Sequence, residues 1–185
     1  GYLAMHAALA RPELFRALIN LHSPGVPLAR FYALRAAFGV PGALPLLHAL
    51  IARDPEKWVY KNVHYYDETL KSREELRTYA APLRSPEGRV AFSRYLKETL
   101  APSPMQRFHD ELVRRRKNRE RFPTPLLLLY STTDPIVPPS VGERLAALIP
   151  SADFRWLEET SHFAHVDTPA LVLEAARTFF ARHAR

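Results

Sequence analysis

Two polar residues with complementary chemistry follow two apolar runs of the chain. Asp134 comes shortly after residues 126–130, and His162 comes shortly after residues 154–157. If the two runs are neighbouring parallel strands about 4.8 Å apart, both loops emerge at the carboxyl edge of the sheet and the side chains can touch. A carboxylate bonded to one imidazole nitrogen fixes the tautomer and stabilises the imidazolium, so the other nitrogen can take a proton from a nucleophile or a water. The spacing therefore indicates two thirds of a catalytic triad.

The elements that must position these residues follow from the apolar runs and the turn residues. We predict a helix over residues 2–11 and buried strands over 17–21, 126–130 and 154–157, each followed by a polar loop. His22 ends the first of these strands at the same sheet edge, and we expect it to be a hydrogen-bonded turn histidine outside the site. Strands that alternate with helices predict an α/β fold.

Two further helices are predicted by their first residues. Ser140 with Glu143 forms a capping-box pattern between the second and third strands, and Pro150 ends that helix. Asp167 precedes Thr168-Pro169, so we expect its side chain to cap the last helix rather than to serve as a reserve acid.

About a hundred residues separate the first two strands, too many for a simple crossover. Capping-box and helical patterns at Ser72 and Ser85 predict that this insertion is mainly helical. It is rich in aromatic residues, including Tyr65 and Tyr66, which we expect either to pack the insertion against the sheet or to face a ligand.

These segments resemble the α/β-hydrolase family. Gly1-Tyr2-Leu3-Ala4-Met5 resembles the helix that follows the G-x-S-x-G nucleophile elbow, and Ala10 to Ile19 resembles the turn and strand that come next. Residues 128–138 resemble the strand and loop that carry the triad acid, and residues 161–169 resemble the catalytic-histidine loop. The resemblance implies that Asp134 is the acid and His162 the base.

The resemblance also implies a domain organisation. It predicts the C-terminal part of an α/β-hydrolase parallel sheet with an inserted helical cap: residues 1–27 and 123–185 form the catalytic core, and residues 28–122 form the cap. The insertion leaves the carboxyl edge of the sheet after Leu21 and returns before Leu126, so we expect it to lie over that edge as a lid.

No nucleophile elbow occurs in the sequence, and Ser23 and Ser85 stand beside proline without small flanking residues. We therefore expect the nucleophile to precede Gly1 and the chain alone to be inactive. The expected function is hydrolysis of a small, largely apolar, ester-like substrate. The alternatives are an epoxide hydrolase or dehalogenase with an Asp nucleophile, or a non-catalytic relative that binds a small molecule.

The composition of the chain limits which other classes of protein it can belong to. The 185 residues are 47% hydrophobic and 24% charged, as in a folded globular chain, and the absence of Cys excludes disulfides and thiolate chemistry. Residues 114–121 supply +5 of the net charge of +7, without interleaved aromatics, so we expect a solvated helix face or a linker and no nucleic-acid partner. His162 and His165 form H-x-x-H without the Glu of a zinc motif, and we expect no metal and no cofactor.

The expected partners are a small-molecule substrate and an N-terminal segment of the same enzyme. The longest apolar run is too short to cross a bilayer and no signal segment opens the chain, so we expect no membrane partner and a cytoplasmic location.

Overall fold

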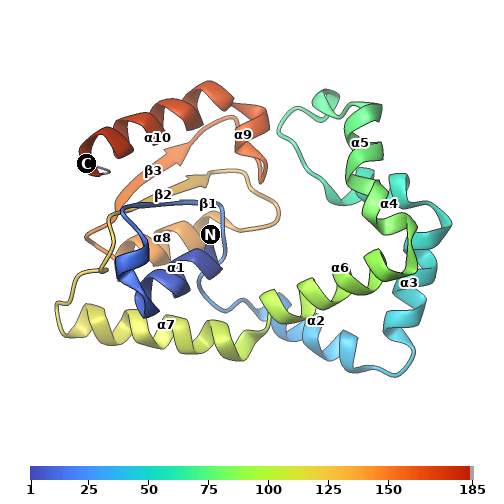
Figure 1. Cartoon of the computed structure of the whole chain (residues 1–185), viewed down its shortest axis with the longest axis horizontal. Helices are drawn as coiled ribbons and strands as arrows, with labels where there is room; N and C mark the ends of the chain where they lie inside the picture. Colours follow the sequence, from blue (N-terminus) through green and yellow to red (C-terminus); the bar gives the residue numbers. More distant parts are fainter. Residues whose placement is uncertain (184–185) are drawn as a thin grey trace. The chain divides into compact units, whose positions relative to one another are not determined.

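A computed structural model describes residues 1–183, which divide into two units (Figure 1). The sheet unit consists of residues 1–26, residues 65–67 and the chain from Gln106 onward. The helical unit consists of Pro27–His64 and Glu68–Met105.

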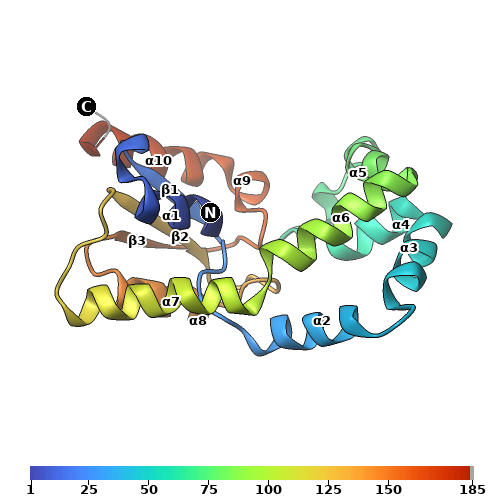
Figure 2. The same cartoon turned by 60° about the horizontal axis from the view of Figure 1, so that its bottom comes forward.

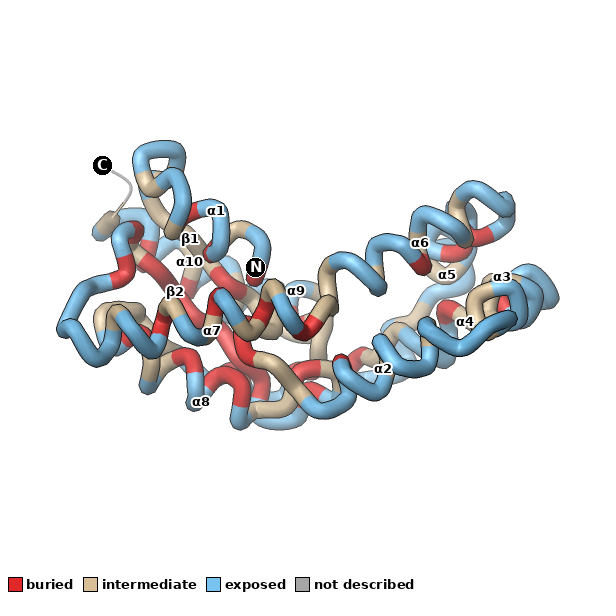
Figure 3. The backbone as a smooth tube through the Cα atoms, turned by 90° about the horizontal axis from the view of Figure 1, so that it is seen from below, coloured by how far each residue is buried: buried red, intermediate tan, exposed pale blue. Residues whose placement is uncertain are grey.

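The sheet unit is built on three parallel strands in the order β1-β2-β3. They are β1 (Leu18–Leu21), β2 (Leu126–Ser131) and β3 (Asp153–Leu157). All six residues of β2 are buried (Figure 3), because this central strand is covered on both faces and paired at both edges. This explains its unbroken apolar run and confirms the predicted α/β class with a partial parallel sheet.

Two helices cover opposite faces of this sheet (Figures 1 and 2). On one face, α10 (Pro169–His183) places Ala175 and Phe179 in a core with Leu127 and Leu129 of β2. On the other face, α8 (Pro139–Leu148) approaches β2 so closely that a Cβ added at Gly142 would lie 2.6 Å from the Tyr130 Cγ. Alternate side chains of β2 therefore point to opposite faces of the sheet, one packed against α10 and the other against α8.

The remaining elements of the sheet unit flank these layers. They are α1 (Tyr2–Ala10), the short 3-10 helix η1 (Pro12–Leu14), α9 (Ala164–Asp167) and the part of α7 (Pro102–Lys117) from Gln106 onward. Rings of α1 and α7 meet edge to face, with the Tyr2 and Phe108 centroids 5.3 Å apart. The predicted helix over residues 2–11 is thus confirmed to within one residue.

The helical unit contains α2 (Ala29–Gly39), α3 (Ala43–Arg53), α4 (Pro55–Asn62), η2 (Glu68–Leu70), α5 (Arg73–Ala80), η3 (Ala81–Arg84) and α6 (Pro86–Thr99). Its core is formed by Ile51, Val59, Ala80 and Leu83. The Ser72 hydroxyl accepts a hydrogen bond from the Glu75 amide, and the Ser85 hydroxyl accepts one from the Gly88 amide, so both predicted N-caps are confirmed.

The predicted capping box at Ser140 is wrong, because α8 already begins at Pro139 and its N-cap, Pro138, has no hydroxyl.

Within residues 1–183 no single helix is long and apolar enough to cross a membrane. Only α2 and α3 taken together reach that length and apolar character, and this pair is bent by 97°.

Two residues of the basic run at 114–121, Arg114 and Arg115, form local ion pairs. Arg114 bonds to both Glu111 and Glu120, and Arg115 bonds to Glu111 at 2.7 Å. The hydrogen bond from Arg114 is the main reason that the pKa of Glu111 falls to about 2. The end of α7 is therefore a charged, solvent-facing helix end.

Candidate active site

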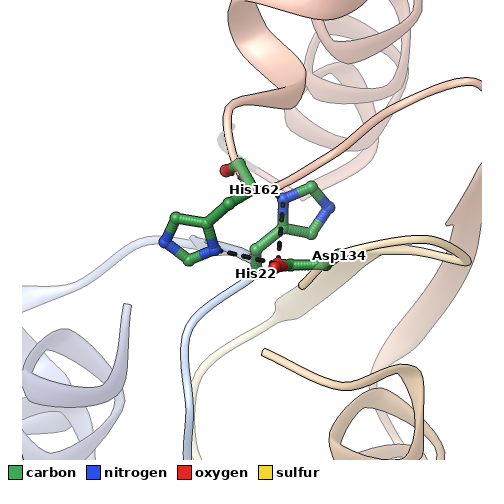
Figure 4. A group of neighbouring side chains, drawn as sticks. All are labelled: His22, Asp134 and His162. Atoms are coloured by element: carbon green, nitrogen blue, oxygen red, sulfur yellow. Dashed lines mark hydrogen bonds and ion pairs between the residues drawn. The ribbon is translucent and has the colours of Figure 1, made fainter. Parts of the chain in front are cut away.

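The candidate site lies where the three parallel strands end. His22 follows β1, Asp134 follows β2 and His162 follows β3, so the strand directions bring all three to one edge of the sheet unit (Figure 4). The Nδ1 atom of His162 lies 2.8 Å from Oδ2 of Asp134. The predicted contact between these two side chains is confirmed, and their catalytic role stays a prediction.

The Asp134 carboxylate is held at both oxygens. Its Oδ1 accepts the backbone N–H groups of Ile136 at 2.7 Å and Val137 at 2.9 Å, while Oδ2 accepts from His162. Burial by itself would raise the pKa of Asp134, but the hydrogen bond and charge of His162 and the two amides outweigh it and lower this pKa. The group is thus a fixed carboxylate that is 5% exposed.

The loop that follows β2 is tied to the loop that follows β3. The hydroxyl groups of Ser131 and Thr133 both donate to the Thr160 carbonyl, and the Thr133 amide donates to the Ser131 hydroxyl at 3.0 Å. These bonds join the segment that carries Asp134 to the segment that carries His162. Ser131 therefore has a structural reason to end this strand.

Asp167 holds the same histidine loop from its other side. Its Oδ2 accepts the Ser161 N–H at 2.7 Å and the Ser161 hydroxyl at 3.0 Å, and its Oδ1 accepts the Tyr66 N–H at 2.8 Å. The prediction that Asp167 caps the last helix is wrong, because its carboxylate is used by these loop donors and α10 begins two residues later, at Pro169.

The two predicted aromatic residues of the insertion occupy different environments. Tyr65 is buried and its ring meets that of Phe163 edge to face, with centroids 5.4 Å apart, beside the candidate site. Tyr66 has an exposed side chain, and its amide is the donor to Asp167. Tyr65 thus packs in the sheet unit, and nothing in the described contacts directs Tyr66 to the pair.

His22 is the residue that the sequence reasoning left out of the site. It is fully buried, its Nδ1 lies 3.2 Å from the His162 carbonyl oxygen, and the same atom lies 4.0 Å from Oδ2 of Asp134. The expected hydrogen bond of a turn histidine is present, but its partner is the main chain of the predicted base. Its position directly after a strand was the signal in the sequence.

Within residues 1–183, one group of side chains could hold a metal ion. The ligand atoms of His22, Asp134 and His162 all lie within 4.8 Å of one another, whereas His165 is exposed and lies outside the group. Both Asp134 oxygens already accept hydrogen bonds, so the arrangement is that of a hydrogen-bonded cluster. The H-x-x-H pair is not brought together as metal ligands in this part of the chain.

Comparison with known proteins gives a consistent family. A family model described as "Alpha/beta hydrolase family" matches residues 1–175. The uncharacterized hydrolase YugF of Bacillus subtilis is 28% identical over 182 residues, which cover 97% of this chain and 61% of YugF. A 2-hydroxymuconate semialdehyde hydrolase of Pseudomonas putida is 26% identical over 169 residues, covering 90% of this chain and 54% of that protein.

Solved structures give the same fold. A 2-hydroxy-6-oxo-6-phenylhexa-2,4-dienoate hydrolase from Rhodococcus sp. strain RHA1 matches with a TM-score of 0.70 and 20% identity over 97% of this chain and 60% of that one. The epoxide hydrolase CorEH matches with a TM-score of 0.73 and 14% identity over 98% of this chain and 64% of that one. The chain thus spans less than two thirds of the length of these relatives.

Proposed function

The chain belongs to the alpha/beta hydrolase family, and from this premise we propose that it is part of a hydrolase that acts through a nucleophile–Asp134–His162 triad. The substrate that we propose is small, largely apolar and ester-like. The observation that carries the proposal is the 2.8 Å hydrogen bond between His162 and a buried carboxylate at the carboxyl edge of a parallel sheet.

The proposed chemistry uses both nitrogens of His162. Nδ1–H donates to Asp134, which leaves Nε2 as the base that takes the proton of a nucleophile as it attacks a carbonyl carbon. The resulting imidazolium returns the proton to the leaving oxygen, and an acyl-enzyme remains. Water then attacks the acyl group with the same help from His162, and the acid product leaves. Asp134 stabilises the imidazolium in both steps.

We propose that the nucleophile and the oxyanion-hole donors come from sequence that precedes Gly1. The two serines considered above are engaged elsewhere: Ser23 accepts the Tyr2 N–H at 2.5 Å, and Ser85 caps α6. A Cβ at Gly1, the residue before α1, would lie 2.1 Å from the Asn20 Oδ1 and 2.4 Å from the Ser23 Cβ, so a side chain there would require these neighbours to move. This tight start supports a preceding strand-to-helix elbow.

The helical insertion supplies the second part of the proposal. We propose that residues 28–122 act as a cap that controls access to the pair, and that the cap's apolar and aromatic residues select the substrate. One curated relative is named a semialdehyde hydrolase, and its name also gives a small substrate with a carbonyl group. We also propose that the protein acts on a small molecule in the cytoplasm and uses no cofactor, no nucleic acid and no membrane partner.

The same pair would serve an Asp nucleophile. In that case His162 activates the water that hydrolyses an alkyl-enzyme, and the substrate is an epoxide or a haloalkane. A third possibility is a relative that binds a small molecule without turning it over. The three readings differ in the residue at the nucleophile position before Gly1: Ser gives an acyl-enzyme, Asp gives an alkyl-enzyme, and a binder gives no covalent intermediate.

The test compares this 185-residue chain with a version extended at its N-terminus to the length of the relatives. We expect aryl-ester hydrolysis by the extended protein, loss of nearly all turnover in His162→Ala, and no turnover by the short chain. Mass spectrometry of the trapped enzyme separates an acyl adduct on Ser from an alkyl adduct on Asp. Turnover by the short chain that survives His162→Ala would refute the proposal.

A further inference from the structure

His22 is more constrained than its place in a turn requires. Its backbone N–H donates to the Leu129 carbonyl at 3.0 Å, which extends the β1–β2 pairing by one residue. Its φ angle is 52°, in the left-handed region that residues with a Cβ seldom adopt. The side chain is 0% exposed and its ring lies 6.1 Å from the ring of His162 (Figure 4).

The bond to His162 fixes the tautomer of this ring. A carbonyl oxygen can only accept, so the His22 Nδ1 must carry the proton that it donates to the His162 carbonyl, 3.2 Å away. Nε2 is then an unprotonated nitrogen, and within residues 1–183 it is buried without a hydrogen-bond partner. A buried acceptor without a partner and a left-handed backbone both cost stability. An apolar ring such as that of Phe would fill the same space without an unpaired buried nitrogen. The property that histidine supplies and such a ring lacks is therefore the Nδ1–H donor.

We propose that His22 is a positioning residue for His162: its Nδ1–H holds the His162 carbonyl and thereby keeps the His162 imidazole against Asp134. This inference rests on the proposed function, because it assigns a role relative to the predicted base. It also makes a statement about the loop itself that does not depend on turnover.

The charge state of His22 agrees with this role. Burial is the largest effect on the pKa of His22 and lowers it, and the charge of His162 also lowers it, although the hydrogen bond to the His162 carbonyl and the charges of Asp134 and Asp167 act in the opposite direction. A neutral His22 donates to the carbonyl and leaves the Asp134 carboxylate to His162. A charged His22, 4.0 Å from that carboxylate, would compete for it. The Tyr130 ring also lies near the His22 ring, with centroids 6.1 Å apart.

Two substitutions separate positioning from space filling. His22→Asn removes the ring but keeps an N–H donor on the atom that follows Cγ, as in histidine, and asparagine tolerates the left-handed backbone. His22→Phe keeps a ring of similar volume and has no donor. A space-filling role predicts that Phe preserves the loop and Asn disturbs it, whereas a positioning role predicts the opposite.

The readout is the Nδ1 proton of His162, followed by NMR in the 185-residue chain. In the native chain and in His22→Asn we expect this proton to exchange slowly with water, and in His22→Phe about tenfold faster, as for the loss of one hydrogen bond. His165→Phe is the matched control, because His165 is an exposed histidine in α9. In this variant the His162 Nδ1 proton should exchange as slowly as in the native chain. If His22→Phe does not fold, His22→Gly replaces it, since glycine relieves the left-handed strain and also lacks the donor.

The outcomes separate this proposal from the proposed function. If the His162 Nδ1 proton exchanges slowly in His22→Phe or His22→Gly, the positioning role of His22 is refuted. Fast exchange of this proton in a folded His22→Asn refutes it as well. Neither result bears on the proposed function. A folded native chain without a protected Nδ1 proton overturns the Asp134–His162 pair as well. In the extended enzyme, we expect His22→Phe to lower kcat with little change in KM, while His22→Asn keeps both; equal kcat in the two variants contradicts the positioning role.

Discussion

Replacing Asp134 by asparagine should separate the chemistry of the pair from the stability of the loop. The amide oxygen of Asn can keep both backbone donors, which lie 2.7 and 2.9 Å from the present Oδ1. The NH2 group then takes the place of Oδ2, 2.8 Å from the His162 Nδ1. Since an NH2 group only donates, Nδ1 must become an acceptor and the proton must move to Nε2, where it blocks the base.

The expected magnitudes follow from these contacts. Asp134→Asn exchanges a charge-assisted bond for a neutral one and should cost about 1 kcal/mol of the free energy of unfolding, yet lower kcat of the extended enzyme about 10⁴-fold. Asp134→Ala leaves two amides and the imidazole without their acceptor, at about 1–3 kcal/mol for each group that stays buried. The alanine variant should therefore be clearly less stable than the asparagine variant.

Urea unfolding of the 185-residue chain measures the stabilities, and aryl-ester kinetics of the extended protein measures kcat. The folded state lowers the pKa of Asp134, so its stabilising effect is complete above the ordinary value of 3.8 and is lost as the pH falls through the folded pKa. The asparagine variant should lack that part of the acid dependence. An asparagine variant that keeps more than about a tenth of the native kcat would refute the tautomer argument.

Three further outcomes are expected. Gly142→Ala should lower the free energy of unfolding by about 1–3 kcal/mol in urea titrations, because the new Cβ would meet Tyr130 and this overpacking exceeds the gain in helix propensity; an unchanged midpoint contradicts the close approach. The lowered pKa of His22 means that the unfolded chain takes up its proton first as the pH falls below 6.5, so native stability should decrease there relative to His22→Asn; parallel stability curves for the two proteins contradict this. Asp167→Ala removes the acceptor of the Ser161 N–H and should speed amide exchange at Ser161 about tenfold or more; native exchange there would show that Asp167 does not hold the loop.

The sequence by itself determined the strands and the two residues that meet at their ends. The run at 126–130 is apolar at every position because its strand is central and covered on both faces, and this pattern is legible without a structure. Parallel strands share one carboxyl edge, so the contact between Asp134 and His162 follows once the strands are known to be neighbours. Local capping signals were equally readable at Ser72 and Ser85.

Tertiary structure decided which polar groups serve the loop around His162. Asp167 has the local pattern of a helix cap, but Ser161 and Tyr66 compete for its carboxylate. Tyr66 is 101 residues away along the chain and His22 is 140 residues from His162, so no local pattern reveals either contact. These contacts depend on strand register and on the direction of buried side chains, which are set by packing between distant segments. A short-range pattern predicts where a loop begins, whereas the three-dimensional packing determines what holds it.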